Sequence, residues 1–259
     1  MSLLKVTNLG KSFGGVKAVD GISFDLAAGE LLALIGPNGA GKSTTFNMVN
    51  GQLRADVGSI TLDGRELLGL APRDIWRLGV SRTFQIAETF LSLTVVENVQ
   101  MALLSRDKKL YSFFTRAANY MRDEALALLG QVNMLAQADR PCSVLAYGDV
   151  KRVELAIAMA NEPKLLLMDE PTAGMAPKER NDLMALTKRL VSERNMAVLF
   201  TEHSMDVVFA YADRMIVLAR GRLIAGGKPM EVRDDPLVQE VYFGSGKTFE
   251  TTTTVREPA

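Results

Sequence analysis

The stretch Gly36–Thr44, which reads GPNGAGKST, constrains the fold of this chain more than any other stretch. It matches the phosphate-binding loop pattern G-x-x-x-x-G-K-[ST] in full. It follows the apolar run Leu31–Ile35, which is typical of a buried parallel strand. Glycines in such a loop permit positive φ and let backbone N–H groups approach a phosphate. A glycine-rich turn without a ligand is the alternative, and the order strand, loop, helix argues against it.

The residues of this loop have separate expected tasks. Lys42 is expected to reach the β- and γ-phosphates of a nucleotide, and the Ser43 hydroxyl is expected to ligate Mg²⁺. The backbone N–H groups of the loop and of the following helix turn then face the phosphates. The predicted nucleotide-binding set in the loop is Gly36, Pro37, Asn38, Gly39, Ala40, Gly41, Lys42, Ser43 and Thr44.

Composition limits the remaining possibilities. The 259 residues suffice for one or two domains, and 47% hydrophobic with 23% charged residues is a globular composition. Lysine plus arginine equals aspartate plus glutamate, 30 against 30, so bulk charge does not indicate a nucleic-acid partner. Cys142, the only cysteine, fits a reducing compartment and an ordinary small buried side chain. We find neither a leader segment nor a membrane-spanning window of about 18 apolar residues, so we expect any membrane link to pass through a partner.

Strand-like and helix-like runs alternate on both sides of the loop, which predicts an α/β fold with nucleotide at the carboxyl ends of a mainly parallel sheet. Asp20-Gly21 is expected to form a turn between two of the early strands. The expected strands are Leu3–Thr7, Ile22–Leu26, Leu31–Ile35, Gly58–Gly64, Lys164–Met168 and Ala197–Thr201, with a hairpin of Met215–Leu218 and Leu223–Ala225. The expected helices are Lys42 to about Asn50 and Lys178–Arg194.

The pattern becomes helical from about residue 88 to residue 161. Thr94 and Glu97 predict a capping box for a helix through about Leu104. A loop at Ser105–Leu110 and helices at Ala117–Leu129 and Gly148–Ala160 are expected to follow. Because the α/β pattern then resumes, we interpret this region as a helical insertion in one domain of residues 1–244. Residues 245–259 are expected to be a flexible tail.

Two acidic residues and the single histidine are candidates for catalysis. Asp169 and Glu170 follow an apolar strand, which predicts a carboxylate in a Mg²⁺ shell and a general base that polarises water. An acidic turn at a strand end is the alternative. His203 follows another buried strand, and there an imidazole can hydrogen-bond phosphate and water. Taken alone, such a residue is more often an ordinary core or surface histidine, and the other elements of the chain favour the site.

Five motifs in order, GPNGAGKST, Gln85, LAYGD, LLLMDEP and His203, resemble the ATP-binding subunits of ATP-binding-cassette (ABC) transporters from Leu3 to about Gly244. The resemblance implies the fold of that family: a P-loop NTPase core with a parallel sheet, an antiparallel β edge and a helical insertion. It implies that Gln85 contacts Mg²⁺ and water, and that Phe13 stacks on adenine, although a core phenylalanine is the plain alternative. It also implies a signature motif that faces a partner's ATP, formed by Leu145, Ala146, Tyr147, Gly148 and Asp149.

More narrowly, SRTFQIAETFLSLTVVENV, LAYG, EPTAGM and ARGRLIAGGKP resemble the ATPase subunits of branched-chain amino-acid importers. This resemblance implies transmembrane permease subunits as partners, a periplasmic solute-binding protein as an indirect one, and a place on the cytoplasmic face of the inner membrane. Relatives of this kind serve several solutes, so the solute stays open. Phe84, Phe90, Leu91 and Leu93 are expected to contact the permease or to belong to the helical core. An ATPase of lipid or lipopolysaccharide export, a soluble ABC ATPase and a regulatory switch without turnover are the alternatives.

Two positions depart from the family pattern. Asp149 stands where glutamine is usual, and Ala176 stands where aspartate or asparagine is usual. Both positions act on the nucleotide of the opposing subunit in the family's head-to-tail dimer, whereas the residues for the chain's own nucleotide are intact. A carboxylate near a γ-phosphate is repulsive unless a cation or a helix dipole offsets it. We therefore expect a heterodimer with a second, non-identical ATPase subunit and one less active site.

Overall fold

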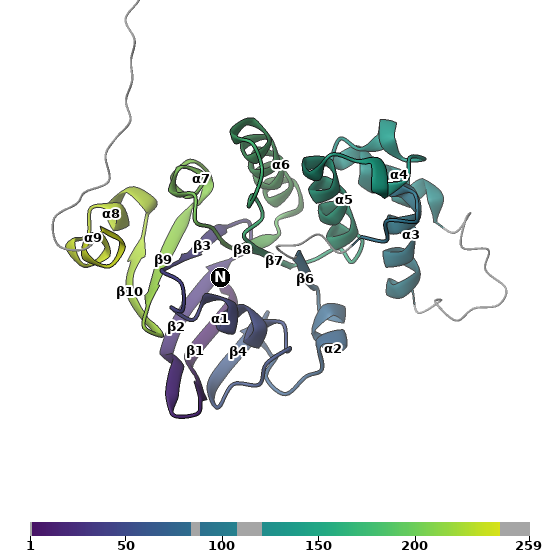
Figure 1. Cartoon of the computed structure of the whole chain (residues 1–259). Helices are drawn as coiled ribbons and strands as arrows, with labels where there is room; N and C mark the ends of the chain where they lie inside the picture. Colours follow the sequence, from purple (N-terminus) through teal and green to yellow (C-terminus); the bar gives the residue numbers. More distant parts are fainter. Residues whose placement is uncertain (1, 84–88, 108–120, 244–259) are drawn as a thin grey trace, which may run out of the picture.

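The computed structural model describes residues 2–83, 89–107 and 121–243, and two sheets with flanking helices organise them (Figure 1). The larger sheet has six strands in the order β10-β9-β3-β8-β7-β6. All of its neighbouring pairs are parallel except β9 and β10, which form an antiparallel hairpin. The predicted α/β class with a parallel sheet is therefore confirmed. Its strands are β3 (Leu31–Ile35), β6 (Val80–Thr83), β7 (Leu165–Asp169), β8 (Ala197–Thr201), β9 (Arg214–Ala219) and β10 (Arg222–Gly227).

The second sheet is antiparallel and has the order β2-β1-β4-β5. The strands predicted at Leu3–Thr7 and Ile22–Leu26 are only parts of longer strands, the first at the start of β1 and the second at the end of β2. The predicted turn at Asp20-Gly21 is wrong, because both residues lie inside β2 beside a register shift that Gly21 accommodates at φ +69°. The strands are β1 (Ser2–Phe13), β2 (Val16–Ala27), β4 (Val57–Leu62) and β5 (Arg65–Glu66).

The helices fall into three groups along the chain. α1 (Lys42–Val49) and α2 (Pro72–Arg77) belong to the first part of the chain. The helical region holds α3 (Val95–Arg106), α4 (Arg122–Gln131), α5 (Tyr147–Met159) and the 3-10 turns Leu135–Gln137 and Cys142–Val144. The last part holds α6 (Pro177–Arg194), α7 (Met205–Tyr211), α8 (Pro229–Arg233) and α9 (Pro236–Phe243).

Most boundaries in the helical region agree with the sequence pattern. The capping box is present, since Thr94 Oγ1 accepts a bond from the Glu97 N–H at 3.3 Å and Glu97 Oε2 accepts one from the Thr94 N–H at 2.8 Å. The predicted loop at Ser105–Leu110 is wrong in its first part, because α3 continues through Arg106. There Arg106 pairs with Glu124 and donates to the Ala160 carbonyl, which stabilises the last turn. Two predicted segments fall at least partly outside the described residues. They are the helix Ala117–Leu129, whose first residues lie within the range 108–120, and the tail at residues 245–259. The domain division stays a prediction.

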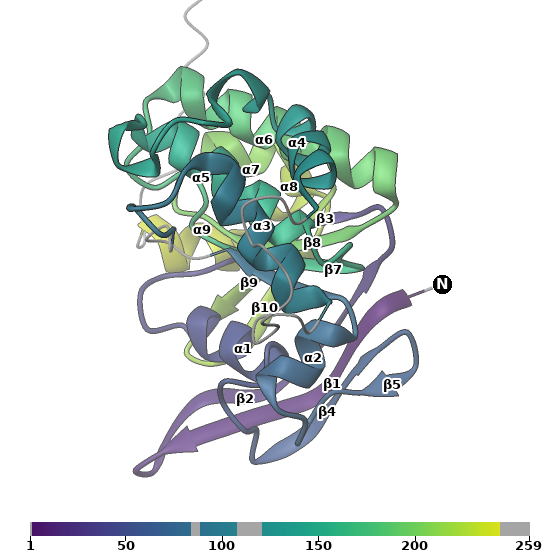
Figure 2. The same ribbon diagram turned by 90° about the vertical axis from the view of Figure 1, so that its right-hand side faces the viewer.

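The two faces of the larger sheet bury two separate cores, as the alternation along β3 shows. Leu31, Ala33 and Ile35 pack with residues of α3 to α8, whereas Leu32 and Leu34 pack with the antiparallel sheet and α1. Figure 1 shows α6 and α7 on one side of the larger sheet and α1 with the antiparallel sheet on the other, and Figure 2 shows the same layers after rotation. In the described part of the chain, no helix has the length and apolar character needed to span a membrane.

Candidate functional site

The loop between β3 and α1 takes a conformation that requires its glycines. Gly41 precedes α1 at φ +107°, and Gly36 follows β3 at φ +154°. A Cβ atom on Gly36 would lie 2.2 Å from the Leu218 carbonyl oxygen, and one on Gly41 would lie 2.4 Å from the Ala18 carbonyl oxygen. Real Cβ atoms do not make such contacts, so the backbone of β9 and β2 excludes any side chain at these two positions. The loop thus stays tight, with Pro37, Asn38 and Gly39 exposed.

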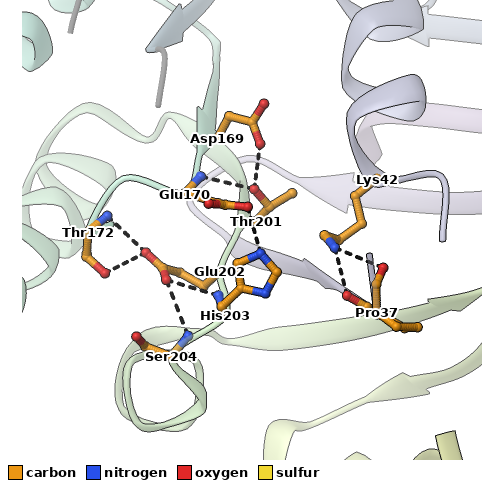
Figure 3. Close-up of polar contacts among 10 residues, drawn as sticks. Pro37, Lys42, Asp169, Glu170, Thr172, Thr201, Glu202, His203 and Ser204 are labelled. Atoms are coloured by element: carbon orange, nitrogen blue, oxygen red, sulfur yellow. Dashed lines mark hydrogen bonds and ion pairs between the residues drawn. The ribbon is translucent and has the colours of Figure 1, made fainter. Parts of the chain in front are cut away.

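Lys42 lies at the centre of this loop. Its Nζ donates to the carbonyl oxygens of Gly36 at 2.7 Å and Pro37 at 3.2 Å, as Figure 3 shows. Burial lowers the pKa of the Lys42 ammonium, and the nearby Glu170 and Asp169 carboxylates act in the opposite direction. Because the carbonyl oxygens and the carboxylates favour its charged form, the Lys42 ammonium is suited to contact an anion such as a phosphate. The neighbouring Ser43 is exposed.

Asp169 and Glu170 lie at the carboxyl end of β7, beside the end of β8. Thr201 connects them, since its hydroxyl donates to Asp169 Oδ1 at 2.8 Å and accepts from the Glu170 N–H at 3.0 Å. Glu170 has a φ of +48°, a conformation that is uncommon for a residue with a side chain. The Thr201 contact therefore helps to hold a strained turn at the point where the Glu170 side chain leaves the strand.

Glu170 and His203 face each other across the ends of two neighbouring strands. The distance from Glu170 Oε1 to His203 Nε2 is 2.7 Å (Figure 3). The Glu170 side chain is 20% exposed and that of His203 is 51% exposed, so the pair is open to a ligand or to water. The structure thus brings together the carboxylate and the histidine that the sequence nominated separately.

Glu202 is a buried carboxylate that sequence analysis missed. Its Oε1 accepts from the Thr172 N–H at 3.0 Å and from the Thr172 hydroxyl at 2.6 Å, and its Oε2 accepts from the His203 N–H at 3.2 Å. Glu202 therefore joins the turn after Glu170 to the segment that carries His203. Only its position between a buried strand and the histidine could have drawn attention to it.

Arg82 on β6 is a second residue that sequence analysis missed. Its Nη2 donates to Asp169 Oδ2 at 2.9 Å, and its Nη1 donates to Asn47 Oδ1 at 2.6 Å. The guanidinium thus connects the end of β7 to the helix that begins at Lys42. Arg82 lies in the stretch SRTFQIAETFLSLTVVENV that resembles the family, but nothing in the sequence indicates its contacts, which come from residues 35 and 87 positions away.

The other predicted site residues lie farther out or outside the described residues. Gln85 and Phe84 fall outside the described residues. Phe13 ends β1 with half of its surface exposed, and the Lys11 ammonium lies 5.6 Å from its ring centroid. It is therefore not a core phenylalanine.

The predicted signature stretch forms the start of α5. Ala146 precedes the helix, Tyr147 is 43% exposed, and Gly148 packs against Glu179 of α6. Asp149 lies in the first turn, and its carboxylate makes no hydrogen bond or ion pair within the described part of the chain. Both views place α5 with the helical region and α1 beside the antiparallel sheet (Figures 1 and 2). The signature therefore does not meet this chain's own phosphate loop.

Comparison with known proteins gives this site a family. Residues 19–173 match the sequence profile described as ABC transporter. The chain belongs to the ABC transporter ATPase family. The high-affinity branched-chain amino acid transport ATP-binding protein LivG of Salmonella typhimurium is 41% identical over 249 residues, which are 93% of this chain and 98% of that protein.

Two solved structures extend the comparison. An ATP-binding cassette of an ABC transporter in its ADP conformation is 32% identical, with a TM-score of 0.84 over 94% of this chain and 99% of that one. A dimeric ATP-binding cassette bound to ADP and phosphate is 25% identical, with a TM-score of 0.73 over 87% of this chain and 98% of that one. The predicted ABC ATPase fold, ATP as the ligand of the family and ATP hydrolysis as its activity are thereby confirmed. The tasks of the individual residues stay predictions.

Proposed function

We propose that this chain is the ATP-hydrolysing subunit of an importer for branched-chain amino acids or a related small solute. The observation that carries the proposal is the 41% identity to LivG over 93% of this chain and 98% of that protein. Peripheral attachment to the cytoplasmic face of the membrane, through permease subunits, follows from this function. Delivery of the solute by a periplasmic binding protein belongs to the same proposal. Lipid or lipopolysaccharide export and a soluble ABC ATPase remain the competing functions.

The phosphate loop and its helix bind ATP in this proposal. The ammonium of Lys42 moves from the loop carbonyls to the β- and γ-phosphates, and the exposed face of Phe13 stacks on adenine. Stacking on an aromatic ring uses the π-face that every base has, so Phe13 contributes affinity more than base selectivity. The remaining ATP-binding residues are those of the loop from Gly36 to Thr44.

Mg²⁺ is the metal that the donor atoms fit. Among the described residues, no cluster of three or more histidine, cysteine or acidic side chains forms a metal cage. Mg²⁺ usually takes one or two protein oxygen ligands together with water and substrate phosphates, which the Ser43 hydroxyl and the Asp169 carboxylate match. When bound, Mg²⁺ neutralises charge that develops on the phosphates. We assign Ser43, Asp169 and Gln85 to this site.

Glu170 acts as the general base in this mechanism. Its carboxylate accepts a proton from the water that attacks the γ-phosphate, while His203 holds the carboxylate and reaches the phosphate through its other ring atoms. General-base catalysis contributes about 10²–10⁴-fold to a rate. Glu170→Gln is therefore expected to lower ATPase activity at least about 100-fold and to leave a stable ATP-bound dimer, visible by size-exclusion chromatography. Turnover near the wild-type rate would exclude Glu170 as the base.

A second ATPase subunit completes each site in this proposal. The dimeric arrangement of the ADP-bound relative supports a pair of subunits, and the separation of α5 from α1 supports a signature that serves the nucleotide of the opposing subunit. Asp149 places a carboxylate without a partner among the described residues in the first turn of that helix, where it repels a γ-phosphate. We propose a heterodimer in which the site made from this chain's phosphate loop is the more active one.

The asymmetry is tested in the assembled complex. Asp149→Gln is expected to raise ATPase activity, and removal of the partner subunit's catalytic glutamate is expected to lower activity less than Glu170→Gln does. Unchanged activity in Asp149→Gln, together with an essential glutamate in the partner, would contradict the asymmetry. The contacts of Ala176 do not explain why alanine stands there in place of aspartate or asparagine.

An exposed apolar surface supports the permease as partner. Phe90 and Leu91 are each 58% exposed, and the buried Asn98 holds their segment through bonds with both the N–H and the carbonyl of Phe90. A cavity of about 420 Å³ is lined by Ile75, Trp76, Ala102 and Ile157, among others, and Ala102 lies one turn after Asn98 on α3. We propose that a cytoplasmic segment of the permease covers this surface.

Transport is the activity to measure. Deletion of the gene is expected to abolish uptake of radiolabelled leucine, isoleucine or valine by whole cells, and the wild-type chain but not Glu170→Gln is expected to restore it. Uptake unaffected by the deletion, with altered lipid or lipopolysaccharide export, would favour the export function. Co-purification with permease subunits separates both functions from a soluble ABC ATPase.

A further inference from the structure

The guanidinium of Arg82 connects the two halves of the nucleotide site. Its Nη2 donates to Asp169 Oδ2 at 2.9 Å, and its Nη1 donates to Asn47 Oδ1 at 2.6 Å and to Gln52 Oε1 at 3.1 Å. Its central carbon also lies 5.9 Å from the ring centroid of Phe46 on α1. Arg82 is only 11% exposed, so these contacts hold its position firmly.

Arg82 is the second hydrogen-bond donor to the Asp169 carboxylate. Thr201 donates to Oδ1 and Arg82 donates to Oδ2, so each oxygen has one protein partner and keeps a lone pair for a further donor. An arginine can do this and also bond Asn47, because its planar fork carries five N–H donors in fixed directions. A lysine ammonium is a point charge and does not reproduce such a bridge.

We propose that Arg82 is a positioning residue for Asp169, and that it increases the gain in ATP affinity which Mg²⁺ provides. The inference rests on the proposed metal role of Asp169. Mg²⁺ demands nearly ideal octahedral geometry, so a carboxylate that is free to rotate serves it poorly. Groups that orient a metal ligand from outside the coordination shell affect metal affinity by about 10–100-fold.

Arg82 also lies three residues before Gln85 in the chain. β6, which carries Arg82, is an edge strand paired only with β7 in the described sheet. The guanidinium bonds therefore fix β6 both to the phosphate-loop helix and to the strand of Asp169. A purely structural ion pair is the competing explanation, and it predicts a loss of stability without a specific effect on Mg²⁺.

Arg214 offers a matched control for that explanation. It also lies on a strand of the six-stranded sheet, and it pairs with the largely buried Glu30 at 3.0 Å. Its register partner on β3 is Leu32, near the start of the strand, whereas the phosphate loop follows the other end. Arg214→Gln therefore removes a comparable ion pair away from the nucleotide site.

The test measures equilibrium binding of a fluorescent ATP analogue to the full chain, with Mg²⁺ and with EDTA. The dissociation constant in EDTA divided by the dissociation constant in Mg²⁺ is called the magnesium gain. Arg82→Gln is expected to lower this gain about tenfold, and Arg82→Lys is expected to recover part of it. Arg214→Gln is expected to keep the wild-type gain, although both glutamine variants lower the melting temperature.

The outcomes separate this inference from the proposed function. An unchanged or larger gain in Arg82→Gln overturns the inference, and a larger gain means that the guanidinium only repels the metal. Asp169→Asn is expected to abolish the gain, and a normal gain in that variant refutes the metal role of Asp169 itself. If Arg82→Gln does not fold, the double variant Asn47→Ala with Gln52→Ala removes both partners of Arg82 Nη1, and an unchanged gain there also overturns the inference.

Discussion

Glu202 provides the sharpest test of how Glu170 and His203, the proposed catalytic pair, are held in place. The carboxylate is 4% exposed, and it accepts bonds from the N–H and the hydroxyl of Thr172, which is itself 2% exposed. Glu202→Ala removes the acceptor of both groups and opens a space that the turn after Glu170 cannot fill without moving. Two buried donors then lack a partner.

The expected cost follows from these contacts. Leaving a buried donor unsatisfied costs about 1–3 kcal/mol, so two donors predict a loss of about 2–6 kcal/mol in the free energy of unfolding. For a chain of this size, a loss of about 3 kcal/mol lowers the melting temperature by roughly 6–12 °C. Because Glu202 adjoins His203, we also expect a fall in ATPase kcat that exceeds any change in KM.

Circular dichroism melts and urea titrations measure the first effect, and steady-state ATPase assays measure the second. Glu202→Gln is the matched control, because its amide oxygen still accepts from Thr172, and only the two longer bonds are lost, from the His203 N–H at 3.2 Å and from the Ser204 N–H at 3.5 Å. We expect it to cost about 1 kcal/mol. A Glu202→Ala protein that melts within experimental error of Glu202→Gln would refute this reasoning.

Three further predictions concern the phosphate loop, the stacking of adenine on Phe13 and the proposed permease surface. Gly36→Ala is expected to abolish ATP binding in a fluorescence titration, because its Cβ would lie 2.2 Å from a β9 carbonyl oxygen, whereas Gly39→Ala, which meets no atom within 4 Å, is expected to lose much less affinity. Phe13→Ala is expected to raise the Kd for ATP about tenfold, since stacking contributes about 1–3 kcal/mol per base, and Phe13→Trp is expected to restore it. Asn98→Ala is expected to reduce co-purification with the permease while ATP affinity stays normal, because the amide holds the Phe90 segment; a parallel loss of both would mean general unfolding.

The strands around the site were predictable because their burial is visible in the sequence. β3 and β8 are buried at all five positions, and both have the predicted bounds. β6 escaped prediction because its four residues include Ser81, Arg82 and Thr83, so no apolar run marks it. α2 escaped for a similar reason, since Ile75 is its only buried residue and one position defines no periodicity.

The residues of the site also divide into those that the sequence could nominate and those that it could not. Glu170 and His203 could be nominated because each follows a buried strand, and parallel strands bring their carboxyl ends to one edge. Arg82, Thr201 and Glu202 could not be nominated, because their importance lies in contacts between distant segments. Asn47 and Thr172 are hydrogen-bond partners of such residues, and no spacing rule identifies them. The sequence thus contains the residues that meet the nucleotide more plainly than those that hold them.

The register of two strands determines whether these residues can act together. Asp169 is the direct partner of Thr201 in the parallel pair of β7 and β8, and this pairing places the threonine hydroxyl between Asp169 and Glu170. Along both strands, alternate residues enter opposite cores, with Met168 and Phe200 in one and Leu167 and Leu199 in the other. A slip by one residue would move every buried side chain of the strand into the opposite core, where the packing partners differ. Packing of the two cores therefore enforces the register, and the register in turn aligns the Glu170 carboxylate with His203.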